Sequence, residues 1–209
     1  RNTTPANAVP ASFYTRGREG LAWQIIDIDD AKNVTGRPRV LLIGDSISIG
    51  YYSLVRDQLA GYCTVDEYGI TYDASDPAFT RDLGALLDVY DYDIIHFNVG
   101  IHRTGAMEPY YGTGVATIMD YLLQKEPNAK IVFATTTPLG SNTPNALMSG
   151  RNAAAKAQAM PRGIGIDDLY QVCLRENPTM SDGIHFRDYT VLANSVVKTV
   201  RTILISRQK

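Results

Sequence analysis

The chain has 209 residues and a formal net charge of −2; 44% of its residues are hydrophobic and 20% are charged. This size suits one domain with a full hydrophobic core, and the charge gives no reason to expect nucleic acid or an anionic membrane surface as a partner. No apolar run approaches the roughly 20 residues that a membrane-spanning helix needs, so no membrane span is expected.

The N-terminal segment differs in composition from the rest of the chain. Residues 1–20 mix Asn, Thr, Pro, Ala and Arg without periodicity, which predicts an extended arm before a single domain over 21–209. The chain begins with Arg1 rather than Met, so we expect a processed or trimmed product. That expectation is compatible with a secreted or periplasmic protein and leaves the compartment open. Residues 23–30 alternate acidic and aliphatic side chains, as in a short strand or a surface segment.

Beyond residue 38, apolar strands alternate with amphipathic helices. Five strands are predicted, at 39–43, 63–67, 93–100, 130–136 and 163–167. Six helices are predicted from apolar residues at helical spacing, at 47–59, 80–89, 114–124, 146–160, 168–175 and 189–205. This order is typical of right-handed βαβ units, so we expect an α/β protein, a three-layer α/β/α sandwich around a five-stranded parallel sheet.

The first of these strands runs directly into Gly44-Asp45-Ser46, and a helix follows. Ser46 is therefore expected at the carboxyl edge of the sheet, on the first turn of a helix, where ligands of open α/β sheets collect. Free N–H groups and the helix dipole can stabilise an oxyanion there. A serine in this place is also a good helix N-cap, so the motif alone leaves both interpretations open.

A histidine that could activate Ser46 lies near the other end of the chain. His185 belongs to the loop before the last helix, which starts from the same edge of the sheet. Asp182 precedes it by three positions, so one tight turn can bring the carboxylate to Nδ1 and leave Nε2 for the Ser46 hydroxyl. The alternative is an Asp-Gly turn that carries a surface histidine.

Two motifs together resemble a known family. Gly44-Asp45-Ser46-Ile47 near the N-terminus and Asp182-Gly183-Ile184-His185 before the last helix are similar to the SGNH (GDSL) hydrolases, and the resemblance covers roughly residues 38–205. It implies a flavodoxin-like sandwich and an esterase or acetylesterase with a Ser-Asp-His triad. Ser46 would then be the nucleophile, His185 the general base and acid, and Asp182 the group that orients His185.

The third motif of the family departs from its usual form. Gly-x-Asn-Asp stands here as Gly100-Ile101-His102-Arg103. In the family the Asn side chain donates to the oxyanion, so the resemblance puts His102 at a donor position, and a neutral imidazole can donate. The alternative for His102 is a capping or structural role. Asn98 is a second candidate donor, with a structural hydrogen bond as its alternative, and His96 is expected to be a core residue.

The family's remaining oxyanion donors are backbone N–H groups, one of the nucleophile serine and one of a glycine in the second motif. That glycine has no clear counterpart, because the segment 68–80 contains only Gly69. A backbone N–H near Ala78 or Phe79 is the substitute that we expect.

Three side chains are candidates for holding substrate. Arg81 and Arg103 could each bind a carboxylate, such as that of an acidic sugar, and surface solvation is the alternative. Tyr51 could stack on a sugar ring or pack inward as a helix residue.

We therefore predict a serine esterase that removes a short acyl group, such as acetyl, from a small-molecule or polysaccharide ester. The carbohydrate substrate is implied by the resemblance. No strand leads into a Gly-x-Gly-x-x-Gly turn and no spacing fits a metal site, so neither cofactor nor metal is expected. Two alternatives stay open: a carbohydrate-binding or scaffold protein that lost efficient hydrolysis, motivated by His102 and Arg103, and an acyltransferase acting on sugars.

Overall fold

The computed structural model describes residues 23–29, 36–104 and 108–207. The expected arm over residues 1–20 lies outside the described residues. The described strands form one sheet in the order β1-β3-β2-β4-β5-β6. Their bounds are β1 Gln24–Asp27, β2 Arg39–Gly44, β3 Thr64–Ile70, β4 Ile94–Asn98, β5 Lys130–Ala134 and β6 Gly165–Asp167.

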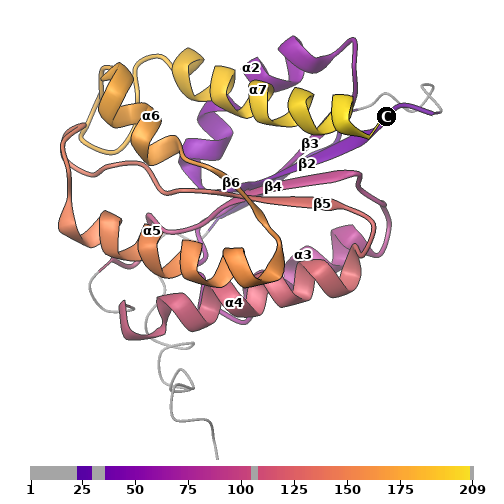
Figure 1. Cartoon of the computed structure of the whole chain (residues 1–209), viewed down its shortest axis with the longest axis horizontal. Helices are drawn as coiled ribbons and strands as arrows, with labels where there is room; N and C mark the ends of the chain where they lie inside the picture. Colours follow the sequence, from indigo (N-terminus) through magenta and orange to yellow (C-terminus); the bar gives the residue numbers. More distant parts are fainter. Residues whose placement is uncertain (1–22, 30–35, 105–107, 208–209) are drawn as a thin grey trace, which may run out of the picture.

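Helices cover both faces of this sheet, as Figure 1 shows. They are α2 Ser46–Leu59, α3 Ala78–Leu87, α4 Glu108–Lys125, α5 Ala146–Ala159, α6 Leu169–Glu176 and α7 Thr190–Ser206, with a short 3₁₀ turn, η1, at Met160–Arg162. Helices α2, α6 and α7 lie on one face and α3, α4 and α5 on the other (Figure 1). The expected three-layer α/β/α sandwich is confirmed.

The burial of strand β2 explains why its residues are almost all apolar. Leu41 and Ile43 point into the core shared with α3, α4 and α5, while Val40 and Leu42 point into the core shared with α2, α6 and α7. A strand in the middle of a parallel sheet is buried on both faces, so it needs apolar residues at every position.

The expected five-stranded parallel sheet needs one correction. The described part of the chain has a sixth strand, β1, which pairs antiparallel with β3, so the sheet is mixed. All four residues of β1 are exposed. An edge strand of this kind buries no apolar face, and its sequence therefore resembles that of a surface segment.

Strand β3 also runs further than predicted, to Ile70 instead of residue 67. Its polar residues are buried because other parts of the fold supply partners. The carboxylate of Asp66 accepts hydrogen bonds from Arg39 Nε (2.6 Å) and from the Tyr92 hydroxyl (2.9 Å). Helix α4 likewise starts at Glu108, before the predicted residue 114, because Pro109 is tolerated in a first helical turn.

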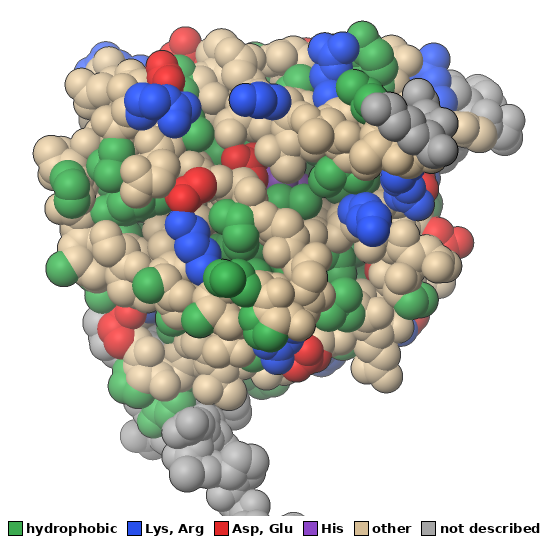
Figure 2. Space-filling model, in the orientation of Figure 1, with side chains coloured by type: hydrophobic (Ala, Val, Ile, Leu, Met, Phe, Trp, Pro, Cys, Tyr) green, Lys and Arg blue, Asp and Glu red, His purple; other side chains and the backbone are tan. Residues whose placement is uncertain are grey.

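Charged side chains are dispersed over the face of the molecule that Figure 2 draws. On the face drawn in Figure 2, Lys and Arg side chains lie between acidic and hydrophobic ones instead of gathering into one patch. No helix among the described residues combines the length and the apolar character needed to cross a membrane.

Candidate active site

The turn after β2 places Ser46 at the carboxyl edge of the sheet. Asp45 caps α2: its Oδ1 accepts the backbone N–H of Ile47 at 2.9 Å. Ser46 is the first residue of the helix and is half-buried. Asp45 therefore supplies the cap, and the Ser46 hydroxyl is left for another role.

The loop before α7 folds into a tight turn around Asp182. Its Oδ1 accepts the backbone N–H groups of Ile184 (2.9 Å) and His185 (2.8 Å). Gly183 has φ +83°, a left-handed conformation that favours glycine, and the backbone N–H of Ser181 closes the turn by donating to the His185 carbonyl at 2.7 Å. The Asp-Gly pair is thus a turn, and this turn presents His185.

The structure brings Ser46, Asp182 and His185 together. His185 Nδ1 lies 2.7 Å from Asp182 Oδ2, and His185 Nε2 lies 2.8 Å from Ser46 Oγ. Hydrogen bonds from the His185 backbone and imidazole, and from the Ile184 backbone, lower the pKa of Asp182 to about 2. An ionised carboxylate only accepts hydrogen bonds, so Nδ1 carries a proton, and in the neutral imidazole Nε2 accepts from the serine hydroxyl.

Solved structures with the same arrangement of elements identify the fold. A carbohydrate esterase family 3 protein from Talaromyces cellulolyticus matches 81% of this chain and 99% of its own, with 17% identity and a TM-score of 0.67. A lipolytic G-D-S-L family protein from Veillonella parvula matches 78% and 98%, with 14% identity and a TM-score of 0.64. The acetyl xylan esterase AlAXEase matches 78% and 99%, with 19% identity and a TM-score of 0.61. The chain has the SGNH hydrolase fold. No protein-family model and no curated protein sequence matches it.

On this SGNH fold, His102 follows β4 and lies near the nucleophile turn. Burial raises the pKa of the Asp45 carboxyl, and the nearby imidazoles of His102 and His185 oppose that rise. Nε2 of His102 is shielded from solvent. The role of His102 as an oxyanion donor stays a prediction.

Two other donor predictions need correction. The side-chain amide of Asn98 is buried and donates to the carbonyl of Ala134, its neighbour across β4 and β5, at 2.9 Å. Asn98 therefore takes the structural role that was its alternative. The backbone N–H groups of Ala78 and Phe79 both donate to Asp76, at 2.9 and 3.0 Å, as part of the turn that starts α3. Neither is left for an oxyanion.

The three residues predicted to hold substrate lie in different environments. Tyr51 is fully buried in α2, edge-on to His96 with ring centres 6.5 Å apart, so stacking on a sugar is wrong for this residue. Arg81 is 69% exposed and pairs with Asp82 at 2.6 Å, which matches the alternative of a solvated surface residue. Arg103 is half-buried next to His102, and its substrate role stays a prediction.

His96 is a core residue, as expected. It is fully buried in β4, and its Nε2 lies 3.2 Å from Asp167 Oδ2 in β6. Among the described residues, no group of His, Cys, Asp or Glu side chains could hold a metal ion.

Sequence reasoning missed one buried charge near this site. Arg151 lies on the buried face of α5 with Met148, Ala155 and Ala159. An arginine inside an apolar stripe at helical spacing is a signal that could have found it, because a buried charge needs partners.

Proposed function

We propose that the chain is a serine esterase of the SGNH family that hydrolyses a short acyl ester. The observation that carries this proposal is the continuous chain of contacts from Asp182 through His185 to Ser46, at 2.7 and 2.8 Å. Nucleophile, base and orienting acid stand in hydrogen-bonding order, and the nucleophile lies at the N-terminus of a helix.

In the acylation step, Ser46 Oγ attacks the ester carbonyl carbon while His185 Nε2 takes the hydroxyl proton. The ionised Asp182 stabilises the imidazolium that forms, and it keeps the tautomer that leaves Nε2 as the base. The tetrahedral intermediate then collapses, the ester C–O bond breaks, and His185 returns the proton to the departing alcohol. In deacylation, a water molecule attacks the acyl carbon while His185 Nε2 takes one of its protons. The second tetrahedral intermediate then collapses, the bond between the acyl carbon and Ser46 Oγ breaks, and His185 returns the proton to Ser46 Oγ as the acid leaves.

Negative charge develops on the former carbonyl oxygen of the intermediate, and hydrogen-bond donors near Ser46 must reach that oxygen. The backbone N–H of Ser46 belongs to the first turn of α2, where N–H groups have no partner within the helix. We assign the second donor to His102, whose imidazole is close enough to influence the pKa of the buried Asp45. Each such donor is worth about 10²–10³-fold in kcat.

We further propose an acetylated carbohydrate as the substrate. Similarity in fold to an acetyl xylan esterase and to a carbohydrate esterase family 3 protein supports this class. The half-buried position of Ser46 at the sheet edge suits a small acyl group.

The test is release of p-nitrophenol from p-nitrophenyl acetate, with acetate release from acetylated xylan measured beside it. Wild type is compared with Ser46→Ala and with Ser53→Ala, a matched control at an exposed serine of the same helix. We expect turnover in wild type and Ser53→Ala and its loss in Ser46→Ala. Equal rates in all three proteins on both substrates would refute the proposal. Acetyl transfer to an added sugar in place of acetate release would point to the acyltransferase alternative.

A further inference from the structure

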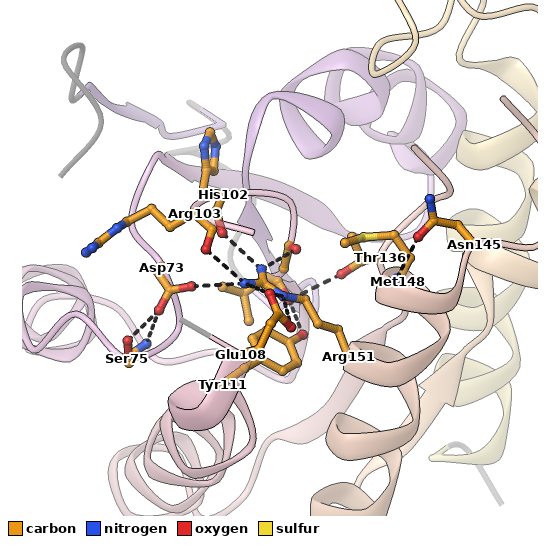
Figure 3. A network of polar contacts seen from close by, with 12 residues as sticks. Asp73, Ser75, His102, Arg103, Glu108, Tyr111, Thr136, Asn145, Met148 and Arg151 are labelled. Carbon is orange, nitrogen blue, oxygen red and sulfur yellow. Dashed lines mark hydrogen bonds and ion pairs between the residues drawn. The ribbon is translucent and has the colours of Figure 1, made fainter. Parts of the chain in front are cut away.

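A buried arginine lies beside the loop that carries His102. Arg151, in α5, has 1% of its surface exposed. Its Nη1 donates to the carbonyl oxygens of Gly100 (2.6 Å) and His102 (2.9 Å), and its Nη2 donates to that of Arg103 (3.2 Å). Figure 3 shows the guanidinium at the centre of these contacts.

The same guanidinium joins two further segments of the chain. Nη2 lies 2.8 Å from Oε1 of Glu108, the first residue of α4, and 3.9 Å from Oδ2 of Asp73, which lies in the loop after β3. The centre of the Tyr111 ring lies 4.7 Å from the guanidinium carbon. A buried charge is costly unless it is paired and hydrogen-bonded, and the partners of Arg151 meet both needs.

These contacts fix the backbone of residues 100–103. Three carbonyl oxygens of this short loop turn toward one side chain, and Arg103 adopts φ +50°, which non-glycine residues rarely do. The imidazole of His102 points away from Arg151 (Figure 3). With the His102 carbonyl held on one side, its side chain is directed to the other.

We propose that Arg151 is a positioning residue, which holds the imidazole of His102 at the oxyanion site through the carbonyl groups of residues 100–103. The inference rests on the proposed function, and it adds a residue that touches neither substrate nor nucleophile. A lysine could not replace it, because an ammonium group is a point charge, whereas the planar guanidinium fork reaches carbonyls and carboxylates in several directions at once.

The test compares Arg151→Lys with wild type and with Val200→Ala. Val200 is a buried residue of the core on the opposite face of the sheet, so this variant controls for loss of stability alone. We expect Arg151→Lys to lower kcat by about 10–100-fold with KM within about threefold, because a displacement of about 1 Å in a catalytic group costs about that much. In Val200→Ala, kcat should stay within about twofold at a temperature where both proteins are folded.

The proposal would be overturned if Arg151→Lys kept kcat within about twofold of wild type while its unfolding temperature fell as it does in Val200→Ala. Arg151 would then be a structural residue only. If Arg151→Lys does not fold, the Glu108→Gln variant is measured instead. Glutamine keeps an acceptor oxygen at this position and removes the negative charge that pairs with the guanidinium. A several-fold loss in kcat at constant KM would then support the proposal, and an unchanged kcat would overturn it.

A second readout separates this inference from the proposed esterase activity. Backbone amide hydrogen exchange is measured for residues 101–104 in wild type, Arg151→Lys and Val200→Ala. Faster exchange in this segment of Arg151→Lys alone supports the positioning role even if the wild type shows no Ser46-dependent hydrolysis. Equal exchange in all three proteins overturns it, whatever the activity.

Discussion

The ring of Tyr189 lies against the backbone of Gly50, in the space that a side chain at Gly50 would occupy. A Cβ atom built on Gly50 would be 2.2 Å from Cζ of Tyr189. Gly50 belongs to the helix that begins with Ser46, and the Tyr189 hydroxyl lies within hydrogen-bonding distance, 3.4 Å, of the backbone N–H of Phe186, next to His185. The glycine therefore lets the His185 loop approach the Ser46 helix closely enough for the two side chains to meet.

Gly50→Ala is expected to push the tyrosine ring aside and to loosen the loop that holds His185. We predict a kcat lowered by about tenfold or more, since small misplacements of catalytic groups have costs of this order. Alanine is the better helix former by about 1 kcal/mol, so helix propensity alone would predict a more stable protein. The measurement is kcat for p-nitrophenyl acetate together with the unfolding temperature.

Two further variants isolate the contact. Gly150→Ala, in α5 with open space around the site of the new Cβ, is the control and should keep full activity. In a Tyr189→Ala background, adding Gly50→Ala should cause little further loss, because the steric conflict is gone. Additive losses in the double variant would mean that Gly50 acts through something other than Tyr189.

A buried acid beside the nucleophile helix predicts a pH-dependent stability. Burial raises the pKa of Glu67 well above its usual value of 4.5, and the charge of Asp45 adds to the rise. The folded protein then holds a proton that the unfolded chain releases above pH 4.5. Stability should therefore fall as the pH rises above that value toward the folded pKa, by up to about 1.4 kcal/mol per pH unit for this one group.

Glu67→Gln removes the titrating group and keeps its shape. We expect the unfolding temperatures of variant and wild type to be similar at pH 4 and the variant to be the more stable protein at pH 8. Glu176→Gln, at an exposed position, serves as the control. A difference between Glu67→Gln and wild type that is the same at both pH values would contradict the raised pKa.

Removing the orienting carboxylate should impair catalysis severely. Asp182→Asn keeps the shape of the side chain, but the asparagine can no longer stabilise the His185 imidazolium. Its amide N–H can donate to Nδ1 and so favours the His185 tautomer with the proton on Nε2, which cannot act as the base. We expect kcat to fall by about 10³–10⁴-fold at pH 7. Because the pKa of Asp182 is about 2, the carboxylate stays ionised at all higher working pH values, and its protonation does not limit activity there.

The exposed Asp188, which accepts a hydrogen bond from Thr190 in the same part of the chain, gives the matched control Asp188→Asn. This control should keep kcat within about twofold, since Asp188 is exposed and lies outside the proposed triad, and surface substitutions of this kind change stability little. An Asp182→Asn variant with kcat within tenfold of wild type would exclude Asp182 from the triad.

The proposed role of His102 as an oxyanion donor predicts a change in kcat without a change in KM. His102→Ala should lower kcat by about 10²–10³-fold with little change in KM, because the donor acts on the charge that develops in the transition state. His102→Gln keeps an N–H donor on a more flexible side chain of similar reach and should recover part of the loss. Full activity in His102→Ala would remove His102 from the oxyanion site.

The sequence predicted the sandwich and the meeting of Ser46 with His185 for one physical reason. Both lie where the chain leaves a buried parallel strand or enters a helix at the same edge of the sheet. The sequence left the segment of the antiparallel edge strand β1 open between a short strand and a surface segment, since an exposed strand carries no apolar pattern. The burial of Asp66 in β3 could not be predicted either, because it depends on Arg39 and Tyr92, which lie elsewhere in the chain.

The finer features of the site depend on tertiary contacts that spacing does not encode. Tyr51 and Asn98 looked like candidates for substrate and oxyanion, and the fold turns both into the interior. The place of Arg151 in an apolar stripe could indicate burial, but the carbonyl groups that it holds come from another segment of the chain. Gly50 carries no signal in the sequence, and its importance arises from the ring that the fold brings against it.

The most direct test of the triad is the site of covalent modification by an alkyl fluorophosphonate, which reacts with activated serine hydroxyls. Intact mass and peptide mapping should show one adduct, on Ser46, that forms quickly in wild type, is absent in Ser46→Ala and forms much more slowly in His185→Ala. Modification of another serine, or labelling of Ser46 at the same rate with and without His185, would contradict the assignment of Ser46 as a nucleophile activated by His185.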